Sequence, residues 1–185
     1  IGMEDPTRYR NKAQFPVGMD GKKAVLGFFG RRSHDIVDMD SCLIQHSVND
    51  KITAIMREFR EKYKIPVYDE KTHRGIIRHV VTKVGFSTGE IMVVIVTNGK
   101  KLPHGVALVS MLRSEIEGLE SVVQNINAKN TNVILGRENI VLWGRDYIVD
   151  TIGEYKFRIS PLSFFQVNPL QTEILYKKAI ESAQL

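Results

Sequence analysis

Cysteine is nearly absent from the sequence, since Cys42 is the only one among 185 residues. A single thiol excludes an internal disulfide, and it cannot alone hold an iron–sulfur cubane, which needs four thiolates. Long hydrophobic runs are also missing: no stretch approaches the roughly 18 apolar residues of a membrane-spanning helix, and no signal peptide is visible. These absences predict a soluble cytoplasmic protein that makes no contact with a membrane.

The chain also lacks two signatures of cofactor and metal sites. No glycine-rich turn follows a predicted strand, so there is no phosphate or nucleotide loop of the usual kind. The histidines His34, His73 and His79 have no ligand spacing such as H-x-x-x-H, and His79 lies inside a predicted strand. We therefore expect no metal site built from these histidines.

Positive charge is in excess, with a net charge of +5 and an isoelectric point near 9.3. Most of the excess lies before residue 35, where seven basic residues stand against three acidic ones. Aromatic residues such as Tyr9, Phe15 and Phe28 are interleaved with these charges. The combination favours a nucleic-acid surface, on which cations neutralise phosphates and rings stack on bases. An ordinary solvated hairpin is the alternative.

Both ends of the sequence look cut. It starts with Ile1-Gly2-Met3, and its last predicted helix ends at Leu185 with neither a glycine cap nor a polar tail. We therefore expect a fragment of a longer protein.

The first third of the chain has the pattern of a hairpin followed by a helix. Two stretches, residues 8–17 and 22–29, flank a four-residue turn at 18–21, which predicts a β-hairpin. Ser47 is placed to cap a helix. The apolar stripe of this helix is formed by Val48, Ile52, Ile55, Met56, Phe59 and Tyr63.

β-branched residues give the middle of the chain its strongest strand signal. Residues 76–84 and 90–97 are rich in valine and isoleucine, and the second stretch is apolar on both faces, so it should be a central buried strand. A strand at 120–127 follows a helix that begins after Pro103, and the expected buried stripe of this helix is Val106, Val109, Leu112 and Ile116. Short strands between 133 and 159 suggest an antiparallel meander. The order predicts an α+β fold with mainly antiparallel sheets and two or three packed helices.

A joint between a strand and a helix lies near the end of the sequence. An apolar alternating run stops at Pro161, and Asn168 with Pro169 provides an N-cap and a first-turn residue. In this last helix, apolar residues recur in register at helical spacing, at Leu175, Ala179 and Ala183. Two aromatics and an amide occupy the joint: Phe164, Phe165 and Gln166. The rings of this group could stack on a flat base while the amide hydrogen-bonds to the edge of the base. The alternative is that both rings are buried in the hydrophobic core.

The joint carries a family resemblance. The segment Ser163-Phe164-Phe165-Gln166-Val167-Asn168-Pro169 closely resembles the signature that leads into the catalytic domain of the RNA uracil-5-methyltransferases, enzymes that use S-adenosylmethionine to methylate C5 of uridine in ribosomal or transfer RNA. Other blocks resemble the family in the same order along the chain: Tyr9-Arg10-Asn11-Lys12-Ala13-Gln14, Arg32-Ser33-His34-Asp35-Ile36-Val37-Asp38, Cys42-Leu43-Ile44-Gln45-His46, Asp69-Glu70 with Arg74-Gly75-Ile76-Ile77-Arg78-His79, and Gln124-Asn125-Ile126-Asn127. The chain looks most like the ribosomal RNA branch, so 23S ribosomal RNA is the expected partner.

The resemblance implies roles for individual residues. Gln166 matches the family glutamine that contacts the cofactor, S-adenosylmethionine, beside the target base. Phe164 matches an aromatic near the flipped uridine, whereas Phe165 is expected in the core. Arg10 and Lys12 match a basic block for which RNA contact is implied.

Cys42 resembles, by position, the fourth cysteine ligand of a 4Fe-4S cluster found in some family members, and not the catalytic thiolate. Such a cluster would belong only to the full-length protein, because the other three thiolates are missing from this chain. The catalytic nucleophile and the glycine-rich cofactor loop are not identifiable either, so the fragment itself should be inactive.

The resemblance also implies a division of the chain. Residues 1–160 would form the central RNA-recognition domain, and residues 161–185 the linker and first helix of the S-adenosylmethionine-dependent catalytic domain. We therefore expect a fragment of an RNA (uracil-5-)-methyltransferase that serves RNA recognition. The alternatives are a stand-alone RNA-binding module without catalytic activity, and a basic scaffold that binds protein.

Overall fold

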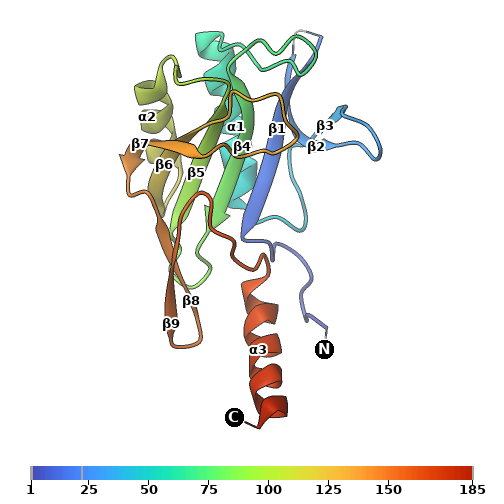
Figure 1. Cartoon of the computed structure of the whole chain (residues 1–185), viewed down its shortest axis with the longest axis vertical. Helices are drawn as coiled ribbons and strands as arrows, with labels where there is room; N and C mark the ends of the chain where they lie inside the picture. Colours follow the sequence, from blue (N-terminus) through green and yellow to red (C-terminus); the bar gives the residue numbers. More distant parts are fainter. Residues whose placement is uncertain (1, 22, 185) are drawn as a thin grey trace.

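The computed structural model describes residues 2–21 and 23–184 and arranges most of them around one seven-stranded sheet (Figure 1). The strand order in this sheet is β3-β2-β1-β4-β5-β6-β7, and β8 with β9 forms a separate hairpin. The strands are β1 (Lys12–Asp20), β2 (Lys23–Phe29), β3 (Ile36–Asp38), β4 (Ile77–Val84), β5 (Ile91–Thr97), β6 (Leu119–Ile126), β7 (Glu138–Gly144), β8 (Ile148–Ile152) and β9 (Tyr155–Ile159). The helices are α1 (Val48–Tyr63), α2 (Gly105–Glu115) and α3 (Pro169–Ala183).

Neighbouring strands of the large sheet are antiparallel, with the exception of β5 and β6, which run parallel. Helix α2 connects this pair, because parallel strands need a crossover. The α+β class with a mainly antiparallel sheet is therefore confirmed. The central strands β4 and β5 are buried at every residue, which was predicted for β5 from its two apolar faces.

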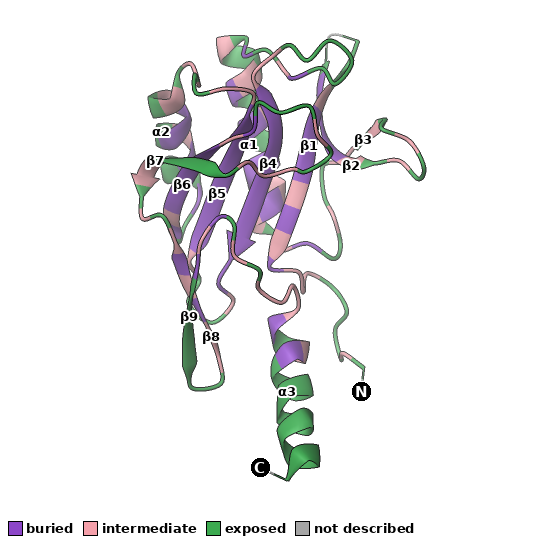
Figure 2. Ribbon diagram, viewed as in Figure 1, coloured by how far each residue is buried: buried purple, intermediate pink, exposed green. Residues whose placement is uncertain are grey.

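The two faces of the sheet are covered differently. Helices α1 and α2 cover one face and enclose the larger apolar cluster, in which Ile52, Met56 and Phe59 of the predicted α1 stripe are buried. Burial of each such side chain stabilises the fold by about 1.5–3 kcal/mol. The opposite face, here called the front face, carries a smaller cluster around Val81 and Met92. Ile148 and Ile159 of the β8–β9 hairpin belong to that cluster, and Ile134, Leu135 and Phe165 pack against it. Figure 2 shows the central strands buried and most of β9 exposed.

Some local predictions in the first two thirds of the chain were wrong. The hairpin turn is not at 18–21, because β1 continues through Asp20, which pairs with Lys23. β2 begins at Lys23, and Gly21 has the positive φ of 56° that glycine tolerates in a tight turn. Lys22, which opened the predicted second stretch, lies outside the described residues.

Two predicted contacts of the helices are also absent. The Ser47 side chain makes no capping hydrogen bond, because its φ of −59° and ψ of −26° are already helical, whereas an N-cap residue needs an extended backbone. Val106 is 87% exposed, since the buried stripe of α2 is centred on Leu108 and Leu112. The other predicted members of that stripe, Val109 and Ile116, are buried.

The region from 133 to 159 is not one meander. Strand β7 pairs with β6 at the edge of the large sheet, whereas β8 and β9 pair only with each other. The chain leaves the large sheet at Gly144, whose φ is 74°. A Cβ atom at this position would lie 2.1 Å from the carbonyl oxygen of Glu120, so only glycine allows this close approach.

Helix α3 projects away from the sheet (Figure 1). It begins as predicted, with the Asn168 Oδ1 atom accepting a hydrogen bond from the backbone N–H of Gln171 at 3.1 Å. The predicted apolar register of Leu175, Ala179 and Ala183 is not buried, and Leu175 is 63% exposed. Within residues 2–21 and 23–184, no helix combines the length and the apolar character needed to cross a membrane.

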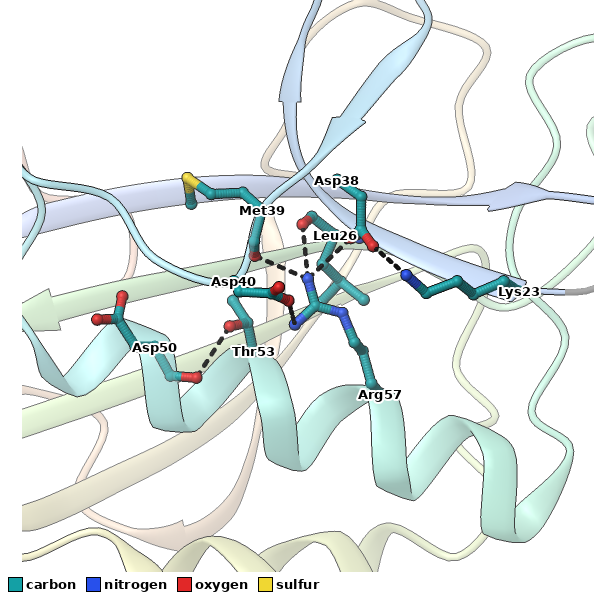
Figure 3. Close-up of polar contacts among 8 residues, drawn as sticks. All are labelled: Lys23, Leu26, Asp38, Met39, Asp40, Asp50, Thr53 and Arg57. Atoms are coloured by element: carbon teal, nitrogen blue, oxygen red, sulfur yellow. Dashed lines mark hydrogen bonds and ion pairs between the residues drawn. The ribbon is translucent and has the colours of Figure 1, made fainter.

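A half-buried ion pair, between Arg57 and Asp38, joins the β2–β3 hairpin to α1 (Figure 3). The Arg57 Nη2 atom donates to Asp38 Oδ1 at 2.8 Å, to the carbonyl oxygen of Met39 at 2.8 Å and to that of Leu26 at 3.1 Å. Burial by itself raises the pKa of Asp38, but hydrogen bonds from Lys23 and Arg57 outweigh it and hold this pKa far below its ordinary value. The pair therefore links this edge hairpin to α1 beside Leu26, which is buried in the larger apolar cluster.

Candidate nucleic-acid interface

The joint between β9 and α3, residues 160–168, is here called the corner segment. A buried lysine of β4 binds the first turn of this segment. The Ser160 and Ser163 hydroxyls bond to each other at 2.8 Å and to each other's backbone N–H groups. The Lys83 Nζ atom, at the end of β4, donates to the carbonyl oxygens of Ser160 at 2.6 Å and Ser163 at 2.8 Å. One ammonium group therefore fixes both ends of the turn.

The second half of the corner segment is held by Asn11, next to the start of β1. The Asn11 Nδ2 atom donates to the Gln166 carbonyl oxygen at 2.9 Å, and the Asn11 N–H donates to that of Val167 at 3.0 Å. Asn11 is itself buried, so this attachment is rigid. The corner segment is thus fastened to the sheet at two points, beside β1 and on β4.

The three side chains of the aromatic and amide group point to different surroundings. Phe164 is 83% exposed. Phe165 packs against the front-face cluster and lies 5.7 Å, centroid to centroid, from Phe157. Gln166 is half-buried, so it is not sealed inside the core. A large exposed ring on a fixed backbone is the geometry that a stacking platform needs, because the ring loses little freedom when a base covers it.

The two predicted RNA-binding cations lie beside the corner segment. Lys12 is the register partner of Lys83 and lines a small cleft with Ser163 and Phe165. Burial, and then the neighbouring charge of Arg10, lowers the pKa of Lys12. Arg10 is half-buried, and its backbone pairs with Ile44 and His46. The structure therefore brings Arg10, Lys12, Phe164 and Gln166 to one end of β1.

Sequence reasoning missed Lys83. Burial, and then the charge of Lys12, lowers the pKa of Lys83 to about 8. A signal was present in the sequence, because a lysine inside a valine-rich strand must find polar partners when the strand is buried. Without the fold, however, nothing indicated that Ser160 and Ser163 would be those partners.

Cys42 is half-buried and lies in the stretch that pairs with the N-terminal segment, since the Arg8 N–H donates to the Leu43 carbonyl oxygen at 2.6 Å. Among the described residues, no group of three or more His, Cys, Asp or Glu side chains is placed to hold a metal ion. The residues of this chain therefore do not fit a 4Fe-4S cluster by themselves, because four thiolates are required.

The three histidines considered as metal ligands do not form a group of three ligands in the described residues. The His34 Nδ1 atom lies 2.8 Å from Glu70 Oε2, and the His73 Nδ1 atom lies 2.8 Å from the Tyr68 hydroxyl. His79 is buried in β4 with only 7% of its surface exposed, and its Nδ1 atom has no hydrogen-bond partner among the described residues. Burial, and then the charge of Arg78, lowers the pKa of His79 to about 4.

The depressed pKa of His79 predicts a loss of stability in mild acid. The unfolded chain binds a proton at this histidine below about pH 6.5, whereas the folded chain does so only near pH 4, so protonation favours unfolding between these values. We expect the free energy of unfolding to fall by about 2 kcal/mol between pH 7.5 and pH 5. Urea unfolding of the chain and of His79→Gln at both pH values measures it, since the variant should lack this loss.

A matched control for this measurement is His34→Gln, because His34 is exposed. This variant should keep the acid sensitivity of the unmodified chain. An equal loss of stability in His79→Gln would show that other groups cause it.

Comparisons with known proteins extend these observations. No family model matches the chain. Over all 185 residues the chain is 53% identical to a protein of Clostridium tetani and 51% identical to one of Caldanaerobacter subterraneus, both named as uncharacterized RNA methyltransferases. The chain spans 40% and 41% of the length of these two relatives.

A solved structure has the same fold. The crystal structure of Pyrococcus abyssi tRNA (uracil-54, C5)-methyltransferase in complex with S-adenosyl-L-homocysteine matches 96% of the chain with a TM-score of 0.78 and 25% sequence identity. The match covers 42% of that protein. The similarity to RNA methyltransferases therefore extends over almost the whole chain and over less than half of each relative.

Proposed function

Because the chain belongs to the RNA methyltransferase family, we propose that its parent protein transfers a methyl group from S-adenosylmethionine to C5 of a uridine, and that this chain recognises the RNA. The observation that carries the proposal is the corner segment. It presents Phe164 to solvent on a backbone that Asn11 and Lys83 hold in place, with Lys12 alongside.

The proposed role of the corner segment follows from the geometry of the reaction. Atoms C5 and C6 of a stacked uracil cannot be approached from the face, so the base must leave the stack. Phe164 would stack on the extruded base, and Lys12 and Arg10 would neutralise the adjacent phosphates. S-adenosylmethionine supplies the methyl group when bound, and Gln166 is the residue of this chain that would contact it.

We propose that most of the cofactor site lies in another part of the parent protein. The sequence has no glycine-rich turn after a strand, and Cys42 lies in the stretch that pairs with the N-terminal segment. We infer that residues 161–185 open a second domain that carries the nucleophile and the cofactor loop. The exposed apolar side chains of α3 support this domain boundary, because such a surface is normally covered; they are Leu170, Ile174, Leu175, Tyr176 and Ile180.

For the substrate we propose ribosomal RNA, and within it 23S RNA, on the resemblance of the sequence blocks to that branch. The solved structural neighbour is named for transfer RNA, so transcripts of both kinds belong in the test. A cytoplasmic location follows from this choice of substrate. If the parent protein holds a 4Fe-4S cluster, Cys42 is the ligand that this chain would contribute.

Methyl transfer by the parent protein tests the proposal. With radiolabelled S-adenosylmethionine and unmodified 23S and transfer RNA transcripts, we expect label at C5 of uridine in the 23S transcript. Phe164→Ala should lower kcat/KM about 10- to 100-fold, because stacking of one base is worth about 1–3 kcal/mol. The matched control is Leu162→Ala, an exposed apolar residue of the same corner segment, which should stay within about twofold.

Other results would contradict parts of the proposal. Full activity of Phe164→Ala would remove the stacking role. Label on RNA incubated with the 185-residue chain alone would show that the chain is itself catalytic. RNA binding by the parent protein without any label would favour the stand-alone RNA-binding module.

A further inference from the structure

A pocket lies at the other end of β1 from the corner segment. It has a volume of about 570 Å³ and is formed by the β1–β2 hairpin, the loop before β3, the segment 68–71 and the start of β4. This volume lies in the range of sites for small organic ligands, about 300–1,000 Å³. None of the roles proposed above uses this pocket.

The lining of the pocket combines aromatic rings with hydrogen-bond acceptors. The rings of Phe29 and His34 lie 5.3 Å apart, centroid to centroid, and Tyr68 is a further aromatic in the wall. The acceptors include the Glu70 carboxylate and the buried imidazole of His79. His79 has an unused Nδ1 atom and, with its lowered pKa, remains neutral at pH 7 and can accept as well as donate a hydrogen bond.

The pocket is on the same sheet face as the corner segment. His79, Val81 and Lys83 alternate along β4, so all three side chains point to the front face. Lys83 follows His79 by four positions along the strand, which is roughly 13 Å. Between these ends the front-facing residues Lys12 and Gln14 of the neighbouring strand β1 are half-buried, whereas Pro16, the register partner of His79, is buried. Figure 2 shows the segment between β6 and β7 crossing this face of the sheet toward β1.

The charges of the pocket indicate which part of a nucleotide could enter it. Four carboxylates line it, which disfavours a phosphate; they are Asp20, Asp35, Asp69 and Glu70. Two cations also line it: the exposed Lys71, and the buried Arg78, whose guanidinium already donates to the carbonyl oxygens of Asn127, Lys129 and Thr131. A base inside with its phosphates outside fits this distribution. Carboxylates accept hydrogen bonds from exocyclic amino groups, whereas they repel the two carbonyl oxygens of uracil.

We propose that this pocket holds the base of a second unpaired nucleotide, an adenine or a cytosine, on an RNA strand that runs along β1 from the corner segment. The proposal rests on the proposed function, because it places the second base on the same RNA. It assigns the front face of β1 as the path of the strand and the pocket as a selective contact separate from the target uridine.

Binding of the 185-residue chain to labelled single-stranded decamers, followed by fluorescence anisotropy, tests the proposal. We expect an oligouridine decamer with one adenine or cytosine to bind about tenfold more tightly than the all-uridine decamer. Glu70→Gln should reduce this preference to within about twofold. The matched control is Glu58→Gln, an exposed glutamate of α1 on the opposite face of the sheet, which should keep the preference.

A third variant separates this proposal from the proposed function. Lys12→Gln should weaken binding of every decamer alike and lower the salt dependence, because it removes a phosphate contact. The pocket proposal is wrong if the chain binds RNA and Lys12→Gln weakens that binding, but adenine or cytosine is not preferred over uridine. It is also wrong if Glu70→Gln keeps the preference. In both cases RNA recognition by the chain stands. If the chain binds none of the decamers at low salt, RNA recognition by this chain fails as well.

Photocrosslinking gives a second, independent readout. A decamer carrying 5-iodocytidine should crosslink to a peptide that contains Phe29, His34 or Tyr68, as identified by mass spectrometry. Crosslinks confined to the corner segment would overturn the assignment of the pocket.

Discussion

Arg57→Met is expected to lower the free energy of unfolding of the chain by about 1.5–3 kcal/mol, because it removes the charge-assisted hydrogen bonds of a half-buried ion pair. The substitution keeps most of the apolar stem and removes three hydrogen bonds, those to Asp38, Met39 and Leu26. Asp38 then keeps only the exposed Lys23 as a charged partner. Urea unfolding at pH 7 measures the difference.

The matched control for Arg57→Met is Lys51→Met, an exposed lysine on the same helix. It should change the free energy of unfolding by less than about 0.5 kcal/mol. Arg57→Lys should recover part of the loss, because a single ammonium can reach Asp38 but cannot serve all three acceptors with a planar fork. A loss below about 1 kcal/mol in Arg57→Met would show that the β2–β3 hairpin is held by other contacts.

Lys83→Met is expected to lower kcat for methyl transfer by the parent protein about 100-fold. Lys83 is a positioning residue, since it contacts the carbonyl oxygens of Ser160 and Ser163 and not the base. Without these two bonds the turn that carries Phe164 is free to shift, and a misplacement of about 1 Å can cost about two orders of magnitude in rate. Steady-state kinetics with the RNA substrate measures kcat and KM separately.

The control variant for Lys83→Met is Lys100→Met, which removes a surface lysine paired with Glu138. It should leave both kinetic constants within about twofold. Circular dichroism at the assay temperature must show that Lys83→Met is folded, and Lys83→Arg should restore part of kcat by donating to the same carbonyl oxygens. Normal kcat in a folded Lys83→Met protein would contradict the positioning role.

The parts of the fold that could be predicted are those in which local pattern and burial agree. Strands β4 and β5 are β-branched and buried on both faces, and the α1 stripe recurs at helical spacing, so each element was recognisable by itself. The parallel pairing of β5 with β6 and the departure of the chain at Gly144 depend on contacts between distant segments. No local pattern carries that information.

The candidate site shows the same division. Phe164, Gln166 and the Asn168 cap stand in one short segment, so the sequence could place them together at a joint. Lys83, in β4, and Asn11, just before β1, contact that segment although both are distant from it in sequence. Only the arrangement of the strands in the sheet shows that these contacts exist. The apolar register of α3 was predicted as well, yet the described residues provide no surface that packs against Leu175.

The hydrogen bond from Asn11 to Gln166 spans 155 positions of the chain. Contacts with such a large separation in sequence close a long loop, which is entropically costly and delays their formation. During synthesis from the N-terminus, Gln166 is made after all the strands of the described structure, so its hydrogen bond with Asn11 cannot form earlier. We therefore expect the corner segment to be the last part of this domain to fold during synthesis on the ribosome, after the sheet has formed.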